Sequence, residues 1–201
     1  MKNVFGVALL AASLFAGSVA SAAVLGVTGD VSIIGTPSSV TNATPNSNTS
    51  MLVFNEVQNL VLGSNITTST GTILAGTRVN SQMVLLNRVS NTTLLKLKGT
   101  VTFDGLILGF ITSTAGLAAT DAILGAVGTT YEKFRLRGLE GNESVSGQGT
   151  STLALNLIVR QPGDWMRVVT VAAVPVPAAG FLLVGALGGL AALRRRKALA
   201  A

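Results

Sequence analysis

Two segments of the chain place apolar residues at every second position for most of their length. The apolar residues of the first segment, 95–103, fall on one face of an extended chain: Leu95, Leu97, Val101 and Phe103. Those of the second segment, 152–159, do the same: Leu153, Leu155, Leu157 and Val159. A period of two residues is typical of a β-strand with one buried face and one solvated face. Both segments are therefore predicted to be strands.

Shorter apolar runs between clusters of Gly, Asn, Ser and Thr predict further strands. These runs are residues 24–34, 57–62, 71–74, 81–86, 106–111, 133–137 and 165–171. Residues 36–50 are almost wholly polar, and we predict a loop or a mobile segment there. One short helical turn is predicted near residues 118–124, with Thr120 or Asp121 as its cap.

Strands with one polar face favour antiparallel sheets, and this many strands need two packed layers. Residues 23–173 are therefore predicted to form an all-β domain, an antiparallel β-sandwich of jelly-roll type. No fixed-period repeat indicates a solenoid or a propeller. An α/β fold would need helical periodicity between the strands, and the sequence lacks it.

The first 22 residues have the three parts of a secretory signal peptide. Lys2 supplies a positive charge, residues 4–17 are apolar, and the small residues Ala20 and Ala22 occupy the positions that a signal peptidase reads. Cleavage is expected after Ala22. The alternative is an uncleaved anchor helix, but the apolar run is short for a membrane span.

Residues 174–201 combine a proline motif, an uncharged apolar segment and a cationic cluster. The motif is Val174, Pro175, Val176, Pro177 and Ala178. Residues 178–193 are expected to form a hydrophobic helix, which at about 1.5 Å per residue spans roughly 24 Å, slightly under the roughly 30 Å hydrocarbon core. The cluster would act as a stop-transfer signal on the cytoplasmic side: Arg194, Arg195, Arg196 and Lys197.

This order of proline motif, apolar helix and basic cluster resembles the PEP-CTERM class of sorting tails, and in particular the variant described as VPLPA-CTERM in Gram-negative bacteria. Val176 stands where that variant usually has Leu, and Phe181 stands where Trp is common. The resemblance implies that an exosortase in the inner membrane recognises the proline motif, cleaves there and passes the body outward. A permanent single-pass anchor is the alternative that the residues alone allow.

Scattered blocks of the body also resemble a domain that proteins with such tails often carry. The blocks are residues 53–62, 76–87, 99–110, 120–125, 137–145 and 163–170. This resemblance implies an extracellular β-rich domain without an assigned activity, and it supplies no catalytic residue.

The net charge of +6 does not describe the body of the protein. Lys2 and the C-terminal cluster account for five of the 14 basic residues, whereas all 8 acidic residues lie between Asp30 and Asp164. The body is therefore nearly neutral. A nucleic-acid partner would need a basic face, so none is expected.

The chain contains neither cysteine nor histidine. Disulfides, thiolate nucleophiles, the commonest general base and the commonest transition-metal ligand are therefore excluded. No pattern pairs two carboxylates, and neither a G-x-S-x-G elbow nor a P-loop occurs. We expect no enzymatic activity, no catalytic residue and no cofactor other than calcium.

Calcium takes oxygen ligands alone and is common outside cells. The densest cluster of oxygen-bearing side chains is Glu140, Asn142 and Glu143, which are candidate calcium ligands. The alternative is an ordinary solvated turn, because no EF-hand pattern is present. Few aromatic residues are left to stack on sugar rings, which weakens a carbohydrate-binding interpretation.

These features predict an exported bacterial protein with a structural or adhesive role. Signal peptidase and an exosortase would process it, and its contact with the inner membrane would be transient. It would then reside at the cell surface or in the extracellular matrix of a Gram-negative bacterium, with exopolysaccharide as a candidate partner. The alternatives are a calcium-assisted carbohydrate-binding module and a single-pass anchored envelope protein.

Overall fold

Strands dominate the structure, a computed structural model that describes residues 24–88, 94–159 and 163–172. The elements are β1 (Val24–Gly29), β2 (Val31–Ile33), β3 (Ser39–Val40), β4 (Met51–Asn55), β5 (Leu60–Val61), β6 (Ile66–Thr68), β7 (Gly71–Ile73), β8 (Arg78–Leu86), β9 (Leu95–Phe103), β10 (Ile107–Ile111), α1 (Thr114–Leu124), β11 (Thr130–Tyr131), β12 (Ser144–Ser146), β13 (Thr152–Val159) and β14 (Asp164–Val171). The predicted signal peptide and sorting tail, with both terminal helices, lie outside the described residues. Within those residues, no helix has the length and apolar character needed to cross a membrane.

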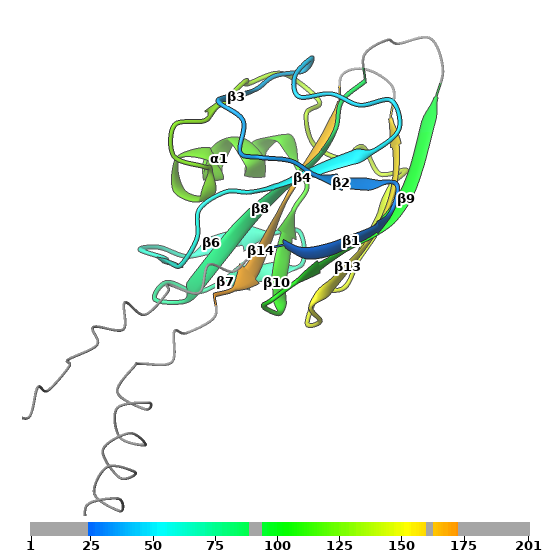
Figure 1. Cartoon of the computed structure of the whole chain (residues 1–201). Helices are drawn as coiled ribbons and strands as arrows, with labels where there is room; N and C mark the ends of the chain where they lie inside the picture. The colour runs from blue at the N-terminus through cyan, green and yellow to red at the C-terminus, as the bar shows by residue number, and fades with distance from the viewer. Residues whose placement is uncertain (1–23, 89–93, 160–162, 173–201) are drawn as a thin grey trace, which may run out of the picture. The chain divides into compact units, whose positions relative to one another are not determined.

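Two sheets form the framework (Figure 1). Sheet A has the strand order β1-β9-β13-β12, and all of its neighbouring strands are antiparallel. Sheet B has the order β10-β14-β8-β4-β2, and β5 also pairs with β8. Its pairs are antiparallel except β2 with β4. For the described residues, the prediction of a mostly β fold built largely of antiparallel sheets is thus confirmed.

The first hydrophobic core lies between sheets A and B, as in a β-sandwich. In β9 and β13 the buried residues alternate with solvent-facing ones, as the sequence pattern predicted. The buried members of this core are Val31, Met51, Val53, Val84, Leu86, Leu97, Val101, Phe103, Ile107, Phe110, Leu153, Leu155, Leu157, Val159, Met166 and Val168.

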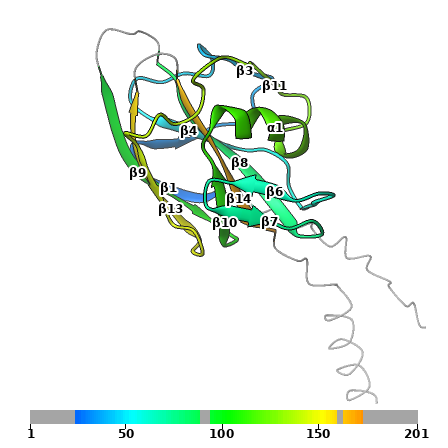
Figure 2. The ribbon, with the colours of Figure 1, turned by 180° about the vertical axis from the view of Figure 1, so that it is seen from behind.

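Sheet B buries its other face as well, under α1, the β6–β7 hairpin and the β3–β11 pair (Figures 1 and 2). The buried members of this second core are Val40, Leu52, Phe54, Leu62, Ile66, Ile73, Val79, Met83, Leu85, Ile111, Leu117, Leu124, Trp165 and Val169. The two packed sheets therefore carry a third layer on the outer face of sheet B, which the sequence analysis did not predict. Strands buried on both faces show no apolar–polar alternation, and β8 and β14 are buried along almost their whole length.

The predicted strands at residues 95–103 and 152–159 coincide with β9 and β13. The predicted run 24–34 is instead divided at Asp30 into β1 of sheet A and β2 of sheet B. Gly29, with φ of 68°, forms the corner. The Asp30 backbone and carboxylate both bond the backbone of Lys98, at 2.8 and 3.0 Å, and so hold the crossing against β9.

Two strand predictions fail where the backbone takes a positive φ. Residues 133–137 form no strand, because Leu136 has φ of 63° and the period of two is lost there. Within residues 57–62 only Leu60–Val61 is a strand, and Asn59 has φ of 58° immediately before it. The sequence analysis also missed β4, whose first four residues are all buried.

The helix was predicted too short and with the wrong cap. It begins at Thr114, and the Ser113 side chain accepts a hydrogen bond from the backbone of Gly116 at 3.1 Å, as an N-cap residue does. Thr120 and Asp121 are not caps. They lie in the second half of α1 and bond to side chains outside the helix.

Candidate functional site

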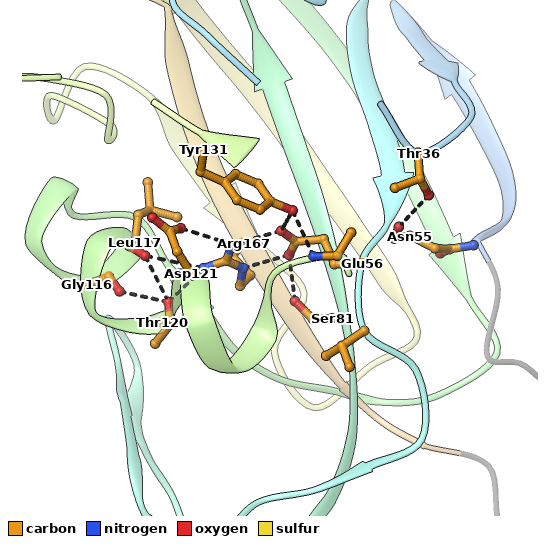
Figure 3. Close-up of polar contacts among 12 residues, drawn as sticks. Thr36, Asn55, Glu56, Ser81, Gly116, Leu117, Thr120, Asp121, Tyr131 and Arg167 are labelled. Atoms are coloured by element: carbon orange, nitrogen blue, oxygen red, sulfur yellow. Dashed lines mark hydrogen bonds and ion pairs between the residues drawn. The ribbon is translucent and has the colours of Figure 1, made fainter. Parts of the chain in front are cut away.

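A network of charged side chains lies between sheet B and α1 (Figure 3). Glu56 directly follows β4, Arg167 lies in β14, Asp121 lies in α1, and Arg137 lies in the segment after β11. The side chains of Glu56 and Arg167 are both 0 % exposed, and that of Arg137 is 1 % exposed. Charged groups are seldom buried unless they are paired, so these contacts decide whether the site is stable.

Glu56 accepts four hydrogen bonds through its two carboxylate oxygens. Arg167 donates to both of them, from Nε to Oε2 at 2.6 Å and from Nη2 to Oε1 at 2.8 Å. The hydroxyl of Tyr131 donates to Oε1 at 2.6 Å, and that of Ser81 donates to Oε2 at 2.7 Å. A two-pronged arginine–carboxylate pair of this kind fixes the relative orientation of both side chains.

The rest of the Arg167 guanidinium bonds to α1. Its Nη1 donates to the Thr120 hydroxyl at 2.7 Å, and its Nη2 lies 3.3 Å from Oδ1 of Asp121. The other oxygen of Asp121 accepts from Nη2 of Arg137 at 2.7 Å. Arg137 also donates from Nη1 to the backbone carbonyl of Glu132 at 3.1 Å. Two carboxylates and two guanidinium groups thus form one balanced network.

Burial and the neighbouring charges together set the protonation states in this network. Burial alone lowers the pKa of Arg167, but the carboxylates of Glu56 and Asp121 more than reverse this and raise it above its usual value. Burial and the charge of Glu56 raise the pKa of Tyr131 well above its ordinary range. Both groups therefore keep their protons at all physiological pH values, and Tyr131 acts as a hydrogen-bond donor.

A second cluster surrounds Trp165, which is fully buried in β14. Phe134 and Trp165 form a T-shaped pair with ring centroids 5.0 Å apart, and the Arg137 guanidinium lies 5.6 Å from the Trp165 ring centroid. The indole nitrogen donates to Oδ1 of Asn87 at 2.8 Å. Arg137 therefore connects the charged network to the aromatic cluster.

Asn87 in turn fixes the polar segment at residues 36–50. Its Nδ2 donates to the carbonyls of Thr41 and Pro45, both at 2.9 Å, and its own carbonyl accepts from the backbone of Ser47 at 2.9 Å. The segment is mostly a loop, as predicted, and contains the two-residue strand β3. These bonds tie it to the end of β8.

The network is suited to holding α1 and residues 132–137 against sheet B. Glu56 and Asp121 are 65 positions apart in the sequence, which did not reveal that these two carboxylates meet at one arginine. Both carboxylates bind Arg167, and Glu56 is wholly buried. In this geometry each charge is matched by an opposite charge within the protein, which is the arrangement expected of a structural clamp.

The candidate calcium ligands lie in the turn before β12. Oε2 of Glu143 accepts from the backbone amides of Glu140 and Gly141, at 3.1 and 2.9 Å, and Asn142 is exposed. Burial, together with the charges of Glu143 and Glu140, raises the pKa of Asp164 to about 8. Among the residues that the structure describes, no three His, Cys, Asp or Glu side chains are grouped so as to hold a metal ion.

The sorting motif, the cationic cluster and the signal-cleavage residues Ala20 and Ala22 lie outside the described residues. Asp104, an acidic residue followed by Gly105, lies between β9 and β10.

Comparison with known proteins gives no further guide to function, since no family model, no curated protein and no solved structure matches this chain.

Proposed function

We propose that this chain is an exported bacterial protein that becomes a structural or adhesive component of the cell surface or extracellular matrix. The observation that carries the proposal is the order of signals along the chain: a leader at residues 1–22, a β-rich body, and a tail at residues 174–201. In this proposal an exosortase processes the tail, so attachment to the inner membrane is temporary.

The character of the body supports a structural role. Its buried charged groups pair within the body and tie α1 to sheet B, and the buried Asn87 ties the 36–50 loop to the end of β8. Exported proteins without disulfides depend on such internal contacts for stability, and this chain has no cysteine. The proposed role is non-catalytic. We also propose that the sandwich is of jelly-roll type, because the successive pairs β8/β9, β9/β10 and β13/β14 each cross between the sheets.

Intact-mass measurement of protein recovered from the cell surface and the medium tests the proposal. The expected mass lacks residues 1–22 and everything beyond a cleavage point in or near the proline motif. A double substitution, Pro175→Ala with Pro177→Ala, should leave the tail attached, whereas Pro37→Ala in the body should not. A recovered mass that includes Arg194 to Lys197 would instead identify a single-pass anchored envelope protein.

A calcium-assisted carbohydrate-binding module is a second candidate function. The feature behind it is the turn at residues 140–143, where Glu140, Asn142 and Glu143 carry oxygen atoms of the kind that calcium binds. If calcium binds there, adding it should raise the melting temperature, and Glu143→Gln should abolish the rise. An identical melting temperature in calcium and in EDTA would rule the site out. Co-sedimentation with the organism's own exopolysaccharide tests the carbohydrate partner directly.

A further inference from the structure

Exposed apolar side chains gather at the end of the sandwich where β1 begins and β14 ends. Ten large hydrophobic residues are exposed in the described part of the chain, and five of them lie around this end. We name these five the apolar rim: Leu25, Val61, Leu74, Leu106 and Val171. Leu74 is 62 % exposed and Leu106 is 53 % exposed, values that are high for leucine.

Backbone hydrogen bonds show that the members of the apolar rim are neighbours. The amide of Val171 donates to the carbonyl of Leu106 at 2.8 Å. On the other side of β14, Val61 pairs with Arg78 of β8, and the carbonyl of Arg78 accepts from the amide of Ala172 at 3.1 Å.

The remaining two members adjoin these backbone bonds. Leu74 accepts from the backbone of Thr77 at 3.2 Å, next to Arg78. Leu25 follows Val24, which pairs with Phe103, the last residue of β9, three residues before Leu106. The apolar rim is thus one region rather than five isolated side chains.

The chain itself limits how far this end can lie from the tail. Ala178, where the uncharged segment of residues 178–193 begins, is only seven residues beyond Val171. Seven residues, even fully extended, span at most about 25 Å. If the tail enters a bilayer, the end of the sandwich that carries the apolar rim is therefore held near the membrane surface.

We infer that the apolar rim contacts the lipid bilayer while the protein is attached through its tail. The inference rests on the proposed function, because it needs the tail in the membrane. Apolar side chains beside a membrane surface gain free energy by entering the boundary between headgroups and acyl chains. The contact would orient the body, with this end toward the bilayer and the opposite end of β9, near Leu94, away from it.

Single-cysteine labelling tests this orientation, because the chain has no competing thiol. The full chain would carry a fluorophore at Leu106→Cys or at Leu94→Cys. Both positions are exposed leucines, and they flank opposite ends of β9. Each variant is reconstituted into vesicles of phosphatidylethanolamine and phosphatidylglycerol that contain a nitroxide-labelled lipid. The expected result is lipid quenching several-fold stronger at position 106 than at position 94.

Each other outcome overturns the inference in a distinct way. The vesicles are first floated in a density gradient to check attachment. If they float without the protein, the tail does not attach, and the proposed function fails with the inference. If the protein floats but positions 106 and 94 are quenched equally, the attachment stands and the orientation is wrong. If the label at position 106 is shielded from lipid and from aqueous iodide alike, another protein surface covers the apolar rim.

Discussion

At the scale of single residues, the sequence reveals the amount of charge but not its pairing. The bond between Glu56 and Arg167 joins positions 111 residues apart, and neither residue stands in a motif. No local pattern encodes such a contact, because it depends on how β4 and β14 are placed across sheet B. One signal was available in the sequence: Arg167 lies within an apolar run predicted to be a strand, and a cation that becomes buried requires a counter-charge.

The first prediction concerns this ion pair. We expect Glu56→Gln and Arg167→Met each to lower the free energy of unfolding by about 3 to 5 kcal/mol, because each leaves a buried charge without its main partner. The double variant should lose clearly less than the sum, since both charges are then removed. Urea unfolding at neutral pH measures all three values, and Lys133→Gln, at an exposed cation, is the control. Strictly additive losses would show that the two side chains act independently.

The second prediction concerns Asp164, which is 4 % exposed and whose pKa burial and the charges of Glu143 and Glu140 raise to about 8. Because its folded-state pKa exceeds the unfolded value near 4, its contribution to stability is complete below pH 4 and is lost as the pH rises through 8. Asp164→Asn should therefore unfold at higher urea than the parent at pH 8, by an amount that shrinks toward pH 4.

The pH profile of the Asp164→Asn variant decides this point, and Asp104→Asn, at an exposed carboxylate, is the comparison. The slope assigned to Asp164 cannot exceed about 1.4 kcal/mol per pH unit, the limit for one proton. Parent and variant curves that run parallel from pH 4 to pH 8 would show that Asp164 ionises normally in the folded protein.

At the scale of elements, alternation identified the strands that face water. Because β9 and β13 belong to sheet A and keep one solvated face, their bounds could be read from the sequence. Sheet B is different, since its central strands are covered on both sides. β4 is an almost continuous apolar run that does not distinguish a strand from a buried helix, and it was missed. β8 was predicted too short because its first half carries the buried polar residues Asn80, Ser81 and Gln82.

The third prediction concerns the joint between β8, β14 and the 36–50 loop. A Cβ atom at Gly163 would overlap with the carboxamide of Asn87, which holds both the loop and the Trp165 indole. Gly163→Ala should therefore displace Asn87 and destabilise the protein by about 2 kcal/mol, the scale of a lost buried hydrogen bond. Gly35→Ala is the matched control, since a Cβ at Gly35 meets nothing within 4 Å.

Tryptophan fluorescence reports on this joint directly, because Trp165 is the sole tryptophan of the chain. In Gly163→Ala the native emission should shift to longer wavelength as the indole loses its partner and its burial. An unchanged emission maximum together with unchanged stability would mean that Asn87 accommodates the methyl group without releasing the ring.

At the scale of the whole molecule, sheet B joins the two hydrophobic cores. Adjacent residues of its central strands belong to different cores: Val84 and Val168 lie in the first core, whereas Leu85 and Val169 lie in the second. Neither core can lose its packing without disturbing the strands that support the other. The ion network adds to this coupling, since Arg167 binds α1 from a strand of the sheet.

The fourth prediction is that all three layers unfold in a single transition. Leu117→Ala creates a cavity in the core under α1, and Leu157→Ala creates one between the sheets; both side chains are 0 % exposed. Each should cost about 2 to 5 kcal/mol. In each variant the urea midpoint from Trp165 fluorescence, which reports on the α1 side, should coincide with the midpoint from far-ultraviolet circular dichroism, which reports on the strands. A fluorescence midpoint that falls below the dichroism midpoint in Leu117→Ala alone would show that the third layer melts independently of the sandwich.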